Sequence, residues 1–84
     1  MPFWVYIIES KVSAMTYIGQ TNNLTDRLKR HNENRNSFTK GKGPWSLIYS
    51  EQFTSRVEAV RKEKYFKSLK NKEYLLKIIQ RHVG

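Results

Sequence analysis

The chain has 84 residues, a length that predicts one domain with a modest hydrophobic core. Lysine and arginine number 16 against 7 acidic residues, and the formal charge of +9 favours nucleic acid as a partner, ahead of an anionic membrane surface. No cysteine is present, which excludes disulfides, thiolate catalysis and cysteine-ligated zinc.

Two stretches rich in β-forming residues predict a hairpin at the start of the chain. These are FWVYIIES, residues 3–10, and TYIGQT, residues 16–21, and the segment between them has the composition of a turn. Strand side chains alternate between faces, so Tyr17 and Gly19 share one face, and an aligned register would bring Tyr6 onto it. Gly19 either leaves a gap that a ligand can approach or marks a β-bulge, and periodicity alone favours the bulge.

A helix and a third strand follow the hairpin. Asn22 or Asn23 can cap a helix in which two leucines fall one turn apart, and this helix should end within HNENRN, residues 31–36. The glycine, proline and lysine of SFTKGKGP predict a loop. The alternating pattern of WSLIYSEQF, residues 45–53, then predicts a strand.

Two helices complete the predicted fold. Ser55 and Glu58 fit a capping box ahead of a helix over residues 56–70, and Asn71 opens a last helix over residues 72–83. The resulting order, ββαβαα, predicts an α+β fold in which a small three-stranded antiparallel sheet is flanked by helices.

Three polar side chains share the apolar faces of the first two helices. Arg27 and His31 lie one turn apart beside the leucines, and Glu63 lies in an otherwise apolar sector of its helix. An arginine can hold a phosphate, a histidine can transfer a proton near neutral pH, and a carboxylate can bind a hard cation. The structural alternatives are a snorkelling arginine, a histidine favoured by the helix dipole, and an ion pair between Glu63 and Lys67.

Taken in order along the chain, these residues resemble the GIY-YIG nuclease superfamily, and most closely its small stand-alone UvrC-like bacterial members. The motif VYI at residues 5–7 is followed by YIG at residues 17–19, then by Arg27 and His31, and then by EAVRKEKYFK, which carries Glu63. The first motif departs from the family pattern in having valine where glycine is usual. The resemblance covers nearly the entire chain and implies one nuclease domain over residues 1–84.

The resemblance also implies an activity and roles for particular residues. It implies an endonuclease that hydrolyses phosphodiester bonds in DNA, including structured or damaged DNA, with one divalent cation, Mg²⁺ or Mn²⁺. Tyr6 matches the general base and Tyr17 the tyrosine that hydrogen-bonds around the nucleophile or phosphate. Arg27 matches the residue that stabilises the phosphorane, His31 a histidine that assists the base, and Glu63 the metal ligand.

Further residues are expected to contact the substrate. Gly19 matches the glycine that leaves room for it beside the tyrosines, and Lys29, Lys40 and Lys42 are expected to bind the nucleic acid, DNA ahead of RNA. An alternative function is a binding module without turnover that acts with a protein partner. The longest apolar run, FWVYII, is too short to span a bilayer, and the start of the chain has no basic signal-peptide region, so we expect a cytoplasmic protein without membrane association.

Overall fold

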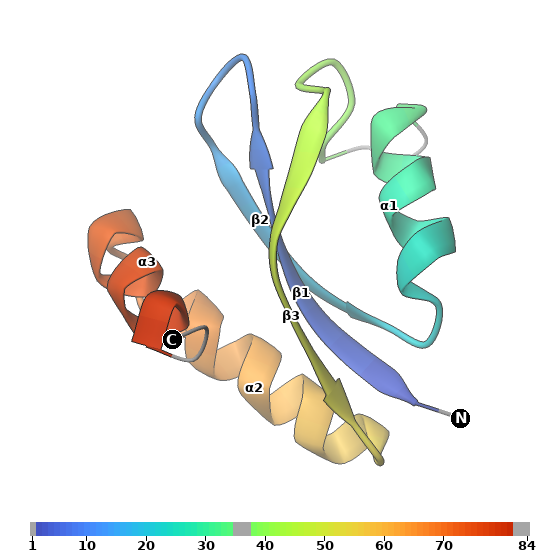
Figure 1. Ribbon diagram of the computed structural model, residues 1–84, viewed down its shortest axis with the longest axis vertical. Helices are drawn as coiled ribbons and strands as arrows, with labels where there is room; N and C mark the ends of the chain where they lie inside the picture. The colour runs from blue at the N-terminus through green and yellow to red at the C-terminus, as the bar shows by residue number, and fades with distance from the viewer. Residues whose placement is uncertain (1, 35–37, 82–84) are drawn as a thin grey trace.

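The computed structural model describes residues 2–34 and 38–81. Its three strands form one antiparallel sheet in the order β2-β1-β3, and its helices lie on both sides of that sheet (Figure 1). The predicted α+β fold and the order ββαβαα are confirmed. The elements are β1 (Phe3–Ser10), β2 (Thr16–Thr21), α1 (Leu24–Asn32), β3 (Trp45–Phe53), α2 (Arg56–Ser68) and α3 (Lys72–Arg81).

The helices begin where the sequence predicts. Each follows a side chain that accepts a hydrogen bond from a backbone N–H of the first turn, and these caps are Asn23, Ser55 and Asn71. Helix α2 ends at Ser68, two residues earlier than predicted, because Leu69 has a non-helical ψ of 79°. The last two residues predicted for α3, 82 and 83, lie outside the described part of the chain. Within the ranges described, none of the helices has the length and apolarity needed to cross a bilayer.

The register of the hairpin places the two tyrosines on one face of the sheet. Tyr6 of β1 lies opposite Gly19 of β2, and Ile8 lies opposite Tyr17. Because side chains alternate along a strand, all four positions belong to the same face. The ring centroids of Tyr6 and Tyr17 lie 6.2 Å apart, as the expected register requires.

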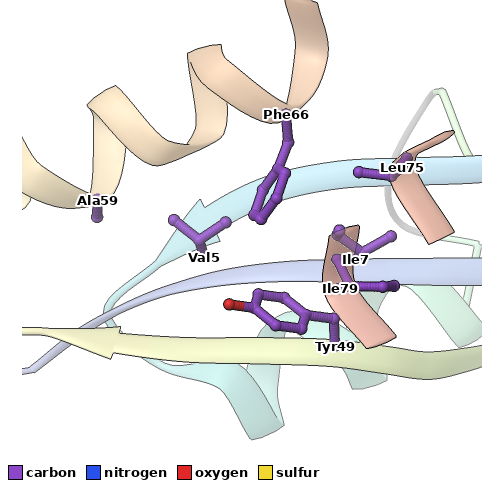
Figure 2. Close-up of a cluster of buried hydrophobic side chains, with 7 residues drawn as sticks. All are labelled: Val5, Ile7, Tyr49, Ala59, Phe66, Leu75 and Ile79. Atoms are coloured by element: carbon purple, nitrogen blue, oxygen red, sulfur yellow. The ribbon is translucent and has the colours of Figure 1, made fainter. Parts of the chain in front are cut away.

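Helices cover both faces of the sheet. Helix α1 packs against the face that carries Tyr6 and Ile8, whereas α2 and α3 pack against the face that carries Val5 and Ile7 (Figure 1). Figure 2 shows the hydrophobic cluster between the sheet and α2 and α3, in which Phe66 of α2 points toward the sheet. The sheet is therefore the middle layer of three. The face that carries Tyr6, covered by α1, positions the candidate site.

Candidate active site

Tyr6 and His31 form a buried pair between the sheet and α1. Tyr6 is 1% exposed and His31 is fully buried. The hydroxyl of Tyr6 lies 2.8 Å from Nε2 of His31, and Nδ1 of the same ring lies 2.8 Å from Oγ1 of Thr39. Side chains from β1, α1 and the segment before β3 thus form a continuous chain of hydrogen bonds.

Tyr6 carries the proton of its hydrogen bond to His31, because burial raises the pKa of the phenol. The positive charge of Arg27 opposes that rise. We therefore assign the Tyr6 hydroxyl as the donor to Nε2 of His31. Because a neutral imidazole carries one N–H, we assign that proton to Nδ1, which donates to Thr39.

The surroundings of the pair shift both of its titrating groups. Burial raises the pKa of Tyr6 well above its usual value, the neighbouring Tyr17 adds to the rise, and Arg27 opposes it. Burial, together with the charge of Arg27, lowers the pKa of His31. At neutral pH Tyr6 is therefore a protonated phenol, and His31 is a neutral ring with a lone pair at Nε2.

Glu63 lies on α2, which reaches the edge of the sheet. Helix α2 packs Ala59 and Phe66 against the opposite face, yet it also contacts β2, which is an edge strand. The negative charge of Glu63 contributes weakly to the raised pKa of Tyr6. The carboxylate forms an ion pair with Lys67 at 2.8 Å, and its side chain remains 19% exposed. The ion pair between Glu63 and Lys67, which the sequence offered as the structural alternative to a metal ligand, is thus present. Solvent can still reach the carboxylate.

The residues available for a metal suit a cation that the substrate helps to bind. Within residues 2–34 and 38–81, no three histidine or carboxylate side chains cluster as metal ligands. Glu63 is the carboxylate whose charge acts on the pKa of Tyr6. Mg²⁺ keeps several water ligands and commonly takes one or two carboxylates together with substrate phosphate oxygens. A single accessible carboxylate therefore fits Mg²⁺ or Mn²⁺ bound together with a phosphate.

The space left by Gly19 is occupied by the ring of Tyr6. A Cβ atom added at Gly19 would lie 2.6 Å from the hydroxyl oxygen of Tyr6 and 2.7 Å from its Cζ. The expectation that this gap admits the substrate is therefore corrected. Gly19 instead lets Tyr6 lie across β2 and reach His31.

Gly19→Ala is expected to destabilise the fold by about 1–3 kcal/mol, the usual cost of overpacking, because the buried ring of Tyr6 has to move. Urea unfolding followed by circular dichroism measures this loss. In a Tyr6→Leu background the same change should cost much less, because the ring that the new methyl group meets is gone. An equal loss in both backgrounds would show that the close approach to Tyr6 is not the reason for the glycine.

The three lysines expected to bind substrate lie in different surroundings. Lys29 is exposed on α1, where it forms an ion pair with the residue that caps the helix, and Lys40 is exposed in the loop before β3. The ammonium of Lys42 lies 4.9 Å from the ring centroid of Phe38. That ring in turn lies 5.5 Å from the ring of Tyr17. Lys42 is thus the one of the three that these contacts connect to the tyrosines.

Phe38 and Thr39 lie at the site but were not predicted from the sequence. A threonine in a loop has no periodicity that reveals burial, and its partner His31 belongs to another element. Phe38 did have a signal, because an aromatic residue among lysines and glycines is typical of nucleic-acid-binding surfaces.

Comparisons with known proteins find matches in both sequence and fold. A sequence model described as the GIY-YIG catalytic domain matches residues 2–75. A UPF0213 protein of Clostridium perfringens is 40% identical over 73 residues, which cover 86% of this chain and 77% of that protein. UPF0213 protein YazA of Bacillus subtilis is 38% identical over 69 residues, covering 81% and 69%. The solution NMR structure of a UPF0213 protein from Bacillus halodurans superimposes with a TM-score of 0.61 at 31% identity, covering 95% of this chain and 84% of that one.

Proposed function

Because the chain belongs to the GIY-YIG family, we propose that it is an endonuclease that hydrolyses phosphodiester bonds in DNA with the help of a divalent cation. The observation that carries this proposal is the buried hydrogen bond between Tyr6 and His31, which joins the sheet to the first helix. Glu63 comes from a second helix, and its charge acts on the pKa of the same phenol. Binding DNA requires lysine and arginine, which the charge of +9 supplies. It does not require a histidine hydrogen-bonded to a buried phenol.

Tyr6 and His31 act together as the base. Tyr6 takes a proton from the attacking water while its own proton passes to Nε2 of His31, 2.8 Å away. A phenol with a raised pKa is rarely ionised near pH 7, so this relay avoids a free phenolate. Thr39 holds Nδ1–H of the ring, which keeps the lone pair of Nε2 directed at Tyr6.

The remaining residues act on the phosphate. Arg27 stabilises the charge that develops on the phosphorane, and Tyr17 hydrogen-bonds the nucleophile or a phosphate oxygen. Glu63 would hold Mg²⁺ or Mn²⁺, and the bound cation would supply positive charge to the scissile phosphate and the departing 3′ oxygen. Lys29, Lys40 and Lys42 contribute phosphate contacts through their charge. These contacts set affinity and take no part in the chemistry.

Cleavage is expected to slow at acid pH. His31 accepts a proton only while it is neutral, and its lowered pKa keeps it neutral from pH 7 down past its usual value of about 6.5. The rate should therefore stay level on mild acidification and fall once the pH passes below the lowered pKa. A profile of single-turnover rate against pH measures this, and a rate that rises on acidification would contradict the role of His31.

Cleavage assays on a panel of substrates test the proposal. Labelled linear, flapped, forked and four-way DNAs and the matching RNAs are incubated with Mg²⁺, Mn²⁺ or EDTA. Cleavage of at least one DNA that requires the cation is expected. The alternative is a nucleic-acid-binding module that acts with a protein partner, and the ion pair that occupies Glu63 favours it. If no DNA is cut with either cation, the endonuclease proposal is wrong and this module replaces it.

A further inference from the structure

A groove of about 510 Å³ runs beside the candidate active site along the edge of the sheet. Residues 16–18 of β2 form one wall, and Phe38, the end of α2 and the start of α3 form the rest. Tyr17 belongs both to this groove and to the site. Lys67, the ion-pair partner of Glu63, lines the groove as well. The groove is therefore continuous with the site.

An aromatic ring and cationic side chains line this groove together. Phe38 is 54% exposed, and Leu69 adds apolar surface. Lys70 and Lys72 supply charge. Lys72 forms an ion pair at 2.9 Å with a glutamate of β1, whereas Lys70 makes no ion pair within the described ranges. An exposed ring beside a cation is how proteins bind unpaired strands, because the ring stacks on a base while the charge meets the backbone.

We propose that this groove binds an unpaired DNA strand next to the scissile phosphate, with one base stacked on Phe38 and a backbone phosphate at Lys70. The position beside the scissile phosphate rests on the proposed function. The volume lies within the range of roughly 300–1,000 Å³ that is common for ligand sites, which leaves room for a nucleotide. A base inside a duplex is already stacked and paired, so it cannot reach the ring without being flipped out. Flapped or single-stranded DNA is thus the substrate class that the groove selects.

Fluorescence anisotropy with a short fluorescein-labelled deoxythymidine oligomer tests the role of Phe38. Phe38→Ala should weaken binding of the oligomer about 5- to 150-fold, the loss that removal of a stacking ring gives. Binding of a labelled blunt hairpin duplex should change much less. Tyr74→Ala is the matched control, because Tyr74 is also an exposed aromatic side chain but does not line the groove.

Salt dependence tests the role of Lys70. Loss of one phosphate contact should make the slope of log affinity against log salt shallower by about 0.7 for the oligomer. Lys77→Ala is the matched control, because Lys77 is an exposed lysine of α3 that does not line the groove. Circular dichroism confirms that each variant is folded.

Two results would overturn the proposal for the groove. One is that Phe38→Ala and Lys70→Ala weaken binding of the oligomer no more than their controls, and the other is that duplex binding falls in the same proportion. Tighter binding of a uridine oligomer would overturn the assignment to DNA.

These results are separable from failure of the proposed nuclease. If wild type cuts DNA but the groove variants match their controls, the groove proposal alone fails. If the oligomer binds through Phe38 but no DNA is cut, the nuclease proposal alone fails.

Discussion

Tyr6→Phe is expected to lower the rate of DNA cleavage about 10²- to 10⁴-fold while DNA affinity stays close to that of wild type. The substitution removes the oxygen that hydrogen-bonds to His31 and that, in the proposed mechanism, takes the proton of the attacking water. The ring stays in place against Gly19, so the shape of the site is kept. Single-turnover rates at saturating enzyme, measured beside binding of the same DNA, separate the two effects.

Tyr49→Phe is the matched control for this prediction. Tyr49 is also buried in the sheet, on the opposite face, and it donates its hydroxyl to Glu51. Each substitution removes a hydrogen bond of a buried phenol, which costs about 1–3 kcal/mol of stability where a buried partner is left unsatisfied. Urea unfolding measures that cost for both variants. Only Tyr6→Phe should lose cleavage, and equal rates in the two variants would remove Tyr6 from the chemistry.

Most of the fold follows from local signals in the sequence. The three strands have the predicted bounds because β-forming residues fill them and turn residues delimit them. The helices begin at the predicted caps because Asn23, Ser55 and Asn71 each satisfy a backbone N–H that has no partner within the helix. The alternation of faces places Tyr17 and Gly19 on one side of the hairpin, and the observed register adds Tyr6 to that side.

The site was only partly predictable, because its contacts join residues far apart in the chain. Helical periodicity indicates which side of α2 carries Glu63, but not which face of the sheet that helix covers. The structure places α2 on the face opposite Tyr6, where it also contacts the edge strand β2. The charge of Glu63 still acts on the pKa of Tyr6. Two further contacts depend on tertiary packing, which local sequence patterns do not predict. They are the hydrogen bond from His31 to Thr39 and the close approach of the Tyr6 ring to Gly19.

Glu63→Gln separates an endonuclease from a binding module. The amide keeps the size of the side chain and much of its hydrogen bonding but lacks the charge that a hard divalent cation requires. The substitution also ends the charge pairing with Lys67, whose ammonium becomes available to phosphate. Glu58→Gln is the matched control, because Glu58 is an exposed carboxylate of the same helix in the turn next to the cap.

The decisive measurement is the cleavage rate and the DNA affinity of Glu63→Gln, both determined with Mg²⁺ on a DNA that wild type cuts. Cleavage should fall by about 10²-fold or more, since the charge of a metal ion stabilises the transition state by several kcal/mol. Affinity should stay level or rise slightly, and Glu58→Gln should match wild type in both. Cleavage at the wild-type rate by a folded Glu63→Gln protein would contradict a metal-dependent endonuclease built around this residue.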